Sequence, residues 1–485
     1  MSAPRHVAVI GGGAAGTLQA LHLKRAGVDV TLIERGPVAG RGVAYGTTRP
    51  EHQLNVPARR MSALADDMGH FSRWFADRSG GTEEDYAPRM LYGDYLAGLL
   101  NETGIVPVQG EAVDVTEAGV VLADGRTIAA DAVVVAPGNF RPATPRGIDV
   151  AALGDLWVDD PWTSGLDGLG PRDVVLLLGT GLTAVDVALT LEATGYNGRV
   201  VALSRRGLAP RSHGLREPMV AARDDLVPSC TAMLRRVRER TKEVGWRSAV
   251  HELRTVTQWL WGAADLAERR RFLRHLRPWW DVHRHKLAPA VGAAIEAMQA
   301  EARLAVAAGR LVSVEPVEGG AEISFRLRGK EQVKQLRAAR IVNCTGPETD
   351  IARAGEPLLS ALLAKGRIRQ DALQIGIDVD PACRAIGADG TASETLSVIG
   401  PVTRGTFWES VAVPDIRAQA ARVAGRLTAE TPVSVRPERS RGALHRLVTG
   451  APRLRSGRTI SGLRPPPRSR SRSGTGRRRP RARRR

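Results

Sequence analysis

The chain has 485 residues, 43% of them hydrophobic and 52 of them glycine, which predicts two or three domains of the α/β kind with many turns. No apolar run reaches the roughly 20 residues that a membrane-spanning helix needs. The formal net charge is +19, but residues 451–485 hold 14 arginines and no acid, so the other 450 residues carry only +5. The charge therefore belongs to one terminal segment and does not indicate a nucleic-acid-binding fold.

The cysteines and the N-terminus favour a cytoplasmic protein. Cys230, Cys344 and Cys383 are scattered and form no C-x-x-C pair, so no disulfide framework, zinc site or dithiol redox pair is predicted. The sequence runs from SAPRH directly into VAVIGGG, without the basic segment and cleavage site of a signal peptide. His283 and His285 stand two residues apart, on different sides of a predicted helix, so we expect no metal site.

The first elements predict a βαβ unit. A short apolar strand at residues 7–10 is followed by a helical segment that stops at Gly27, and VDVTLIER is the next strand. The turn between strand and helix has the spacing G-x-G-x-x-G, formed by Gly11, Gly13 and Gly16. These glycines allow a tight turn, approach of a pyrophosphate to the backbone, and close packing of helix on strand. Free N–H groups and the positive end of the helix dipole at this turn suit a phosphate.

The residues after this unit favour FAD over NAD. Glu34 stands 23 residues after Gly11, where an acid binds the ribose hydroxyls and selects an unphosphorylated ribose. The following stretch, RGPVAGRGVAYGTTRPEHQLNVPARRMSAL, is long, irregular and rich in glycine, as backbone lying against a flat ring system requires. Asn55 could place an amide beside the flavin, or it could be a buried turn residue that satisfies the backbone. We expect this first pocket to include Ala14, Ala15, Arg35, Gly42, Tyr45, Asn55, Met61 and Val113.

A second βαβ unit follows, formed by DVVLLLG, a helix from about Thr183, and GRVVALSRR. Its turn is Gly179-x-Gly181-x-x-Ala184, and the second strand ends without an acid, 25 to 27 residues past Gly179, in Ser204, Arg205 and Arg206. Two guanidiniums and a hydroxyl form a phosphate site that matches the 2′-phosphate of NADPH, and the alternative is a solvated basic corner. Thr180 and Thr183 belong to the same expected pocket, and His213 is a further candidate for NADPH contact. Asp186, inside the helix, is expected to have a structural role.

The rest of the chain predicts a mainly helical stretch, further strands and a tail. Residues 217–308 are mostly helical in pattern, with Trp279 and Trp280 as core or as the wall of a substrate pocket. LVSVEPV and AEISFRLR predict antiparallel strands, RIVNCTGP one more buried strand, and FWESVAVPDIRAQAARVAG a helix. The composition of the Arg-rich tail predicts disorder. Its function could be nonspecific contact with nucleic acid or an acidic membrane. The alternative is that the tail has no function and results from translation of a GC-rich gene in a shifted reading frame.

Together these motifs resemble the bacterial FAD-NAD(P)-binding proteins, which belong with the flavoproteins that have two dinucleotide-binding domains. Class B flavin monooxygenases, including amino-acid N-hydroxylases, are neighbours of that group. The resemblance covers roughly residues 5–425. It rests on VIGGGAAG, GRGVAYGT, HQLNVPARRMSAL, PRMLYGDYL, VVVAPGN, GTGLTAVDVAL, SRRGLAP, LRPWWDVHRHKLAP, VNCTGP and GPVTRGTFWESVAVPDIRAQA.

The resemblance implies roles for several further positions. VVVAPGN and VNCTGP look like the paired segments that cross between the FAD and NADP domains, with Pro137, Gly138 and Gly346 at the crossings. GPVTRGTFWES resembles the last FAD segment, where a helix N-terminus faces the flavin, and makes Gly400, Thr406 and Trp408 candidates there. This chain lacks the acidic Gly-Asp pair that many flavoproteins have at that place.

The sequence thus predicts an α/β protein with two Rossmann-like three-layer domains, the NADPH domain being inserted into the FAD domain. We expect an FAD domain at 1–165 and 346–430, an NAD(P) domain at 166–345 with a helical insertion at 214–308, and a disordered tail at 431–485.

The expected function is that of an FAD-dependent oxidoreductase reduced by NADPH. The leading interpretation is a monooxygenase that uses dioxygen, through a flavin hydroperoxide, to hydroxylate a small substrate such as an amine or amino acid. Asn55 and Trp408 are its candidate catalytic residues. The alternatives are a reductase that passes electrons to a quinone or another acceptor, and a non-catalytic FAD-binding sensor.

Overall fold

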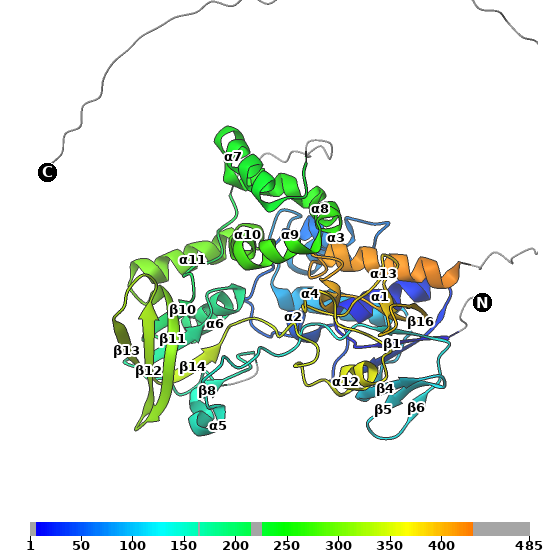
Figure 1. The fold of residues 1–485 in the computed structure, drawn as a ribbon, viewed down its shortest axis with the longest axis horizontal. Helices are drawn as coiled ribbons and strands as arrows, with labels where there is room; N and C mark the ends of the chain where they lie inside the picture. The colour runs from blue at the N-terminus through cyan, green and yellow to red at the C-terminus, as the bar shows by residue number, and fades with distance from the viewer. Residues whose placement is uncertain (1–5, 163–164, 215–225, 430–485) are drawn as a thin grey trace, which may run out of the picture. The chain divides into compact units, whose positions relative to one another are not determined.

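The computed structural model of the chain describes residues 6–162, 165–214 and 226–429. Two mainly parallel sheets, each containing a βαβ unit, organise these residues (Figure 1). The predicted α/β class with two Rossmann-like units is confirmed. No helix of the described residues is long and apolar enough to cross a bilayer.

The first sheet has the strand order β15-β16-β7-β1-β2-β3. Its strands are β1 (His6–Ile10), β2 (Asp29–Glu34), β3 (Val108–Gln109), β7 (Ala132–Val135), β15 (Arg384–Ile386) and β16 (Ala392–Val398). Since β15 and β16 follow the whole second sheet in sequence, the chain leaves the first sheet after β7 and returns to it.

Side chains of the first sheet alternate between two buried faces, as strand geometry requires. Val7 and Val9 pack in one apolar cluster with the helices α1 (Ala14–Arg25), α3 (His70–Ser79), α4 (Arg89–Glu102) and α13 (Val413–Thr428). Ala8 and Ile10 pack on the other face with α12 (Pro357–Ala364) and the antiparallel meander of β4 (Ala112–Thr116), β5 (Gly119–Leu122) and β6 (Thr127–Ile128). Burying both faces gives this unit three layers.

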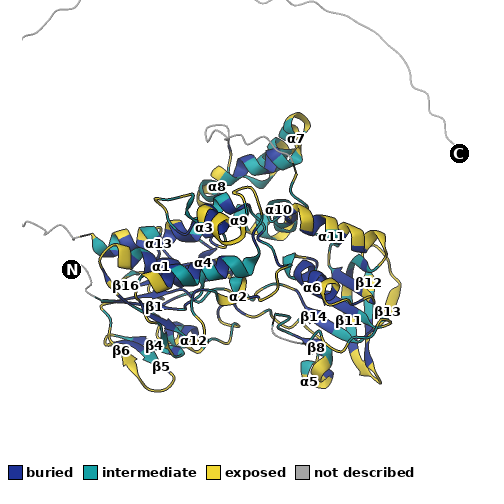
Figure 2. Ribbon diagram, turned by 180° about the vertical axis from the view of Figure 1, so that it is seen from behind, coloured by how far each residue is buried: buried dark blue, intermediate teal, exposed yellow. Residues whose placement is uncertain are grey.

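The second sheet has the strand order β13-β12-β11-β10-β9-β14-β8. Its strands are β8 (Trp157–Val158), β9 (Val174–Leu178), β10 (Arg199–Ser204), β11 (Leu304–Val317), β12 (Gly320–Leu327), β13 (Val333–Ala338) and β14 (Arg340–Asn343). Helices α6 (Leu182–Ala193) and α11 (Pro289–Ala300) pack on one face, and α5 (Val150–Leu153) lies on the other. Figure 2 shows central strands of both sheets in the buried colour.

A group of helices lies between β10 and α11 in sequence. It comprises α7 (Cys230–Glu252, kinked at Gly245), the short helix Leu253–Thr255, α8 (Thr257–Ala263), α9 (Leu266–Arg271), the π-helical turn Phe272–Leu276 and α10 (Arg277–Arg284). The group is tied to the last segment of the first unit, because Trp261 Nε1 donates to the carbonyl of Gly405 at 2.9 Å and Gln258 Nε2 donates to that of Thr406 at 2.9 Å.

Several expected boundaries differ from the structure. β8 lies before the expected domain boundary at residue 165, yet it pairs with β14 of the second sheet. Residues 304–308, expected at the end of the helical stretch, begin β11, because parallel pairing with β10 overrides the helix propensity of their alanines. The last helix begins at Val413 rather than near residue 407, with Pro414 in its first turn, where proline is tolerated. Strand β13 and the β4–β6 meander were not predicted.

Candidate functional site

The first glycine turn has the geometry of a phosphate cradle. Gly11 has a φ of +98°, and an added Cβ there would lie 2.4 Å from the carbonyl oxygen of Ala136. A Cβ on Gly16 would lie 1.8 Å from the oxygen of Gly11, so helix and strand are in direct backbone contact. At Gly13, a Cβ would meet only the Cα of Gly42, at 3.6 Å, so the space before this backbone is open. Gly13 is the N-cap of α1 and no side chain caps the helix, which leaves the first N–H groups to a ligand.

The end of β2 faces the same turn. Glu34 accepts hydrogen bonds from the backbone N–H of Gly12 at 2.6 Å and of Gly36 at 2.7 Å, which fixes its carboxylate at the turn. Arg35 instead points to an ion pair with Glu356, at 2.8 Å, away from the turn. Val113 lies on β4, beside an irregularity in the pairing with β5. The structure therefore brings Glu34 to the glycine turn and does not bring Arg35 there.

The second glycine turn repeats the design of the first. Gly179 has a φ of +129°, and a Cβ there would lie 2.1 Å from the carbonyl oxygen of Cys344, just as Gly11 lies against Ala136. Gly181 is the N-cap of α6, and apart from its chain neighbours no atom of the described residues lies within 4 Å of the position of its Cβ. Thr183 is in the first turn of α6. Each turn thus packs against the end of a crossing strand and keeps its middle glycine open.

The two crossing segments run side by side. Pro142 and Pro347 form an antiparallel bridge, and the N–H of Glu348 donates to the carbonyl of Arg141 at 3.1 Å. Pro137 contacts the Gly11 position, while Gly138 and Gly346 have φ values of +75° and +88°. The chain therefore passes between the two units through a paired connection.

The side chains at the end of β10 differ in whether they have hydrogen bonds to other described residues. Thr180 Oγ1 donates to Ser204 Oγ at 2.9 Å, and Ser204 Oγ also accepts from the N–H of Gly207. Arg206 donates to the carbonyl of Arg274. Arg205 is exposed and has no hydrogen bond to any described residue. Of these side chains, Arg205 is thus the one without a hydrogen bond to a described residue.

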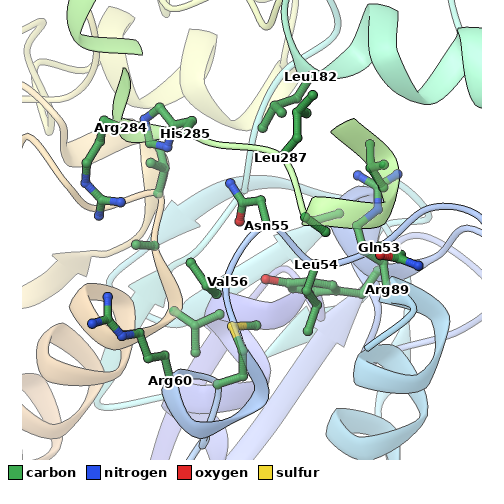
Figure 3. A pocket seen from close by; sticks show the side chains of 18 of the residues that line it. Gln53, Leu54, Asn55, Val56, Arg60, Arg89, Leu182, Arg284, His285 and Leu287 are labelled. Carbon is green, nitrogen blue, oxygen red and sulfur yellow. The ribbon is translucent and has the colours of Figure 1, made fainter. Parts of the chain in front are cut away.

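A cavity of about 200 Å³ lies between the two units. The first unit contributes Tyr45, Asn55 and Met61, and the second contributes Leu182, Val185 and Asp186. Residues 411–414, at the start of α13, and Arg254, Arg284 and His285 from the helical group complete its walls. Figure 3 shows Asn55 in the middle of the view, with Arg60 and Arg284 on one side of it and Arg89 on the other. The cavity therefore joins both glycine-turn units and the helical group.

Buried polar contacts hold the two units together beside this cavity. Arg89, at the start of α4, forms an ion pair with Asp186 of α6 at 2.8 Å, with side chains 19% and 11% exposed. Burial raises the pKa of Asp186 to about 6 even though Arg89 lowers it. His52 Nε2 donates to Thr190 Oγ1 at 2.9 Å, while its Nδ1 accepts from Thr47 at 2.8 Å. Burial lowers the pKa of His52 to about 4, so this ring is neutral at pH 7.

Charged groups also line the side of the cavity that the helical group forms. Arg284 pairs with Glu409 at 2.7 Å, with side chains 11% and 5% exposed. Burial, with a smaller effect of Arg284, lowers the pKa of His285 to about 4. Burial raises the pKa of Asp415 to about 6, against the attraction of Arg254. His285 thus presents a neutral imidazole to the cavity.

Some predicted positions lie away from this cavity. Trp408 packs against Trp261, with ring centroids 4.7 Å apart, and lines a different cavity within the helical group. Thr406 Oγ1 donates to the carbonyl of Val379 at 3.0 Å. Gly400 lies against Ala15, at the start of α1. The two candidate catalytic residues, Asn55 and Trp408, therefore do not line one cavity.

The described histidines that the sequence analysis considered have contacts with protein groups. His213 Nε2 donates to the carbonyl of Asn55 at 2.9 Å, which links the second unit to the Asn55 turn. His283 Nδ1 lies 2.7 Å from the carbonyl of Trp279. Among the described residues, no three His, Cys, Asp or Glu side chains gather in a way that could hold a metal ion.

Sequence reasoning missed Arg89, His52 and residues 411–414. Pro414 was a usable signal, since proline favours the first turn of a helix and here marks where α13 starts at the cavity. Arg89 and His52 gave no comparable signal, because their partners are about 100 residues away or more in sequence.

Comparisons with known proteins agree with this geometry. A family model described as FAD-NAD(P)-binding matches residues 8–140. The chain is similar to the reduced form of ornithine hydroxylase PvdA from Pseudomonas aeruginosa, with 14% identity, a TM-score of 0.62, and coverage of 87% of this chain and 98% of that one. No curated protein sequence matches the chain.

Two further structures show the same likeness. The ornithine N-hydroxylase KtzI of Kutzneria sp. 744, in a structure with reduced FAD, NADP+ and L-ornithine, has 14% identity, a TM-score of 0.62 and coverage of 87% and 98%. L-lysine 6-monooxygenase from Pseudomonas syringae has 15% identity, a TM-score of 0.62 and coverage of 88% and 99%.

These findings define the class of the protein. Residues 8–140 form an FAD-NAD(P)-binding domain. Most of the chain shares its fold with these three structures. The resemblance inferred from the sequence is confirmed at this level, as is a domain of the kind that binds FAD and NAD(P).

Proposed function

We propose that the protein is an FAD-dependent oxidoreductase that takes hydride from NADPH and uses dioxygen to hydroxylate a small substrate. The observation that carries the proposal is the cavity that both glycine-turn units line, with Tyr45 and Met61 on one side and Leu182 and Val185 on the other. Ligands of such sheets bind at the carboxyl ends of the parallel strands, where both turns lie. When bound, FAD would accept the hydride and react with dioxygen.

The residues of the two turns fit these cofactors. The open backbone at Gly13 and Gly181 leaves room for a pyrophosphate at each helix N-terminus. The Glu34 carboxylate suits the unphosphorylated ribose of FAD, and the free guanidinium of Arg205 suits the 2′-phosphate of NADPH.

The cavity walls would orient the substrate and exclude water. Met61, Val185 and Leu287 give apolar surface, which strengthens electrostatic contacts inside. We propose that the Asn55 amide donates a hydrogen bond to the reacting groups, and that the neutral imidazole of His285 accepts a hydrogen bond from the substrate.

An amine or amino acid is the substrate class that we propose. The similar structures are of proteins named for ornithine and lysine. Arg60 and Arg254 place positive charge on one part of the cavity, where Arg284 is already paired with Glu409, and this charge would attract a carboxylate.

The cysteines argue against reduction of a disulfide. Cys344 and Cys383 are buried, and burial raises the pKa of each thiol, to about 11 for Cys383. Burial also raises the pKa of Cys230 to about 11. Since the thiolate is the reactive form, these thiols are poor redox partners at pH 7.

Anaerobic mixing of the FAD-loaded protein with NADPH or NADH tests the proposal. We expect rapid loss of flavin absorbance with NADPH and slower loss with NADH. The Arg205→Ala variant should lose NADPH preference by about tenfold or more, because a charge-assisted bond to phosphate is removed. Arg199→Ala, at the opposite end of β10, is the matched control and should keep the preference. No bleaching with either nucleotide would refute an enzyme and favour an FAD-binding sensor.

Admitting air then separates the two enzymatic functions. A panel of amines and amino acids is screened for stimulated NADPH oxidation and for a hydroxylated product. A product that carries one added oxygen per NADPH supports the monooxygenase. Oxidation of NADPH that needs an added quinone, with no hydroxylated product from any amine, would favour the reductase.

A further inference from the structure

A second cavity, of about 600 Å³, lies within the helical group, and we call it the helical-group cavity. Its volume is in the range of small-molecule pockets in soluble proteins. Apolar side chains of α7, α8, the π-helical turn and α10 form most of its walls. Five tryptophans line it: Trp246, Trp261, Trp279, Trp280 and Trp408. Such walls favour a guest that has a large apolar part.

The helical-group cavity is separate from the cavity between the two units. Some stretches of chain contribute to both, but successive residues line different cavities. Leu253 and His283 line the helical-group cavity, whereas Arg254 and Arg284 line the other, and none of the described residues lines both. A guest in the helical-group cavity would therefore not occupy the site of the proposed oxidation.

The helical-group cavity has both buried and exposed walls. Trp261 and Trp408 are only 6% and 9% exposed, and their ring centroids lie 4.7 Å apart. Trp279 of α10 is 47% exposed, and Arg238 of α7 is exposed as well. An elongated guest can therefore place an apolar part among the buried rings and keep its other end in contact with water.

Two of the charged side chains in the walls are already held by protein groups. Glu268 forms an ion pair with Arg271. Arg269 donates from Nε to the carbonyl of Ala264 at 3.0 Å and from Nη2 to that of Gly262 at 3.0 Å. The charges of Glu268 and Arg269 are opposite, so together they add no net charge to the cavity.

Arg238 is the third charged residue of the walls, counting Arg, Lys, Asp and Glu. Among the residues that the structure describes, Arg238 has neither a hydrogen bond nor an ion pair. The aliphatic stem of an arginine can lie along an apolar wall while its guanidinium stays in water. A guanidinium in this position can attract an anionic group without burial of either charge.

We propose that the helical-group cavity binds an amphipathic anion, namely a monocarboxylate with an apolar chain of the fatty-acid kind. Its carboxylate would pair with Arg238, and its chain would lie among the tryptophans. A cation with the same chain would be repelled by Arg238 instead. The proposal concerns binding at a second site and does not rest on the oxidation reaction proposed above.

The probe for this site is dansyl-undecanoic acid, a fluorescent fatty acid, titrated into the FAD-loaded protein below its micelle concentration. We expect saturable binding with a rise and a blue shift of the dansyl emission. Dodecanoate should displace the probe. Dodecyltrimethylammonium, which has the same chain and the opposite charge, should need a concentration at least about threefold higher, because the sign of its interaction with Arg238 is reversed.

Variants assign the charge preference to one residue. Arg238→Met keeps an unbranched stem but removes the charge, so it should weaken dodecanoate binding about two- to fivefold and abolish the preference over the cation. Arg238→Lys keeps the charge and should keep the preference. Arg78→Met makes the matched change at an exposed arginine of α3, outside the cavity, and should leave both quantities unchanged. Leu234→Trp fills the cavity from α7 and should abolish saturable binding, with a wild-type FAD content as the check on folding.

Several outcomes would overturn the proposal. They are binding of the probe that does not saturate, equal displacement by dodecanoate and dodecyltrimethylammonium, the same loss in Arg78→Met as in Arg238→Met, and unchanged probe binding in Leu234→Trp. Flavin bleaching by NADPH is measured separately on the same variants, so failure here is distinguishable from failure of the proposed function.

Discussion

Substitution of Gly181 by alanine separates cofactor binding from folding. Gly181 is the N-cap of α6, with φ −84° and ψ −164°, an extended conformation that alanine adopts readily. Within the part of the chain that the structure describes, the added Cβ has no atom within 4 Å other than those of its chain neighbours. Alanine caps a helix less well than glycine, but it also lowers the entropy of the unfolded chain by an amount worth about 0.4–1 kcal/mol. We therefore expect the free energy of unfolding to change by less than about 1 kcal/mol.

Binding of NADPH should respond strongly to the same change. The methyl group would occupy the space through which a pyrophosphate approaches the backbone. A loss of about 1.4 kcal/mol raises the dissociation constant tenfold, and we expect at least this for NADPH. The FAD content should stay that of the wild type, because the first glycine turn is untouched.

Gly179→Ala is the matched comparison in the same turn. Its Cβ would lie 2.1 Å from the carbonyl oxygen of Cys344, at a φ of +129°. Strained backbone of this kind costs about 1–3 kcal/mol before the clash is counted, so this variant should lose stability. Urea unfolding and NADPH titration are measured on both variants. Equal loss of stability in the two, or unchanged NADPH affinity in Gly181→Ala, would refute the reasoning.

Three further changes have defined outcomes. Removing either partner of the Arg89–Asp186 pair, as in Arg89→Met or Asp186→Asn, should lower the free energy of unfolding by about 3–5 kcal/mol. A double-mutant cycle should show that the two losses are coupled. Additive losses would contradict this. The folded-state pKa of His52, about 4, lies below its ordinary 6.5, so the unfolded chain takes up the proton first and stability falls as the pH drops from 6.5 to 4. His52→Gln should lose less stability over that window in urea unfolding, and an equal loss would show that His52 is not responsible. Deleting residues 440–485, which lie outside the described residues, should leave FAD content and NADPH turnover unchanged, and loss of either would show that the tail is required.

The parts of the fold that were predicted correctly have local signals. Strands β1, β7 and β9 are short apolar runs next to glycine or proline, and glycine spacing identified both turns. Residues 304–308 were mispredicted because an alanine-rich stretch has no strand pattern of its own, and β13 is a largely polar edge strand. Residues 304–308 form a strand because they pair with β10, and β13 forms because it pairs with β12.

The sequence by itself determined the two dinucleotide units, since the constraints on Gly11, Glu34 and Gly179 come from the backbone within about two dozen residues. Only the tertiary structure decided which side chains share a cavity. It brought Arg89 to Asp186 and Trp408 to the cavity within the helical group, while Asn55 lines the cavity between the two units. Turn geometry depends on neighbours along the chain, whereas a cavity depends on packing between segments that are distant in sequence, and that packing leaves no periodic pattern in the sequence.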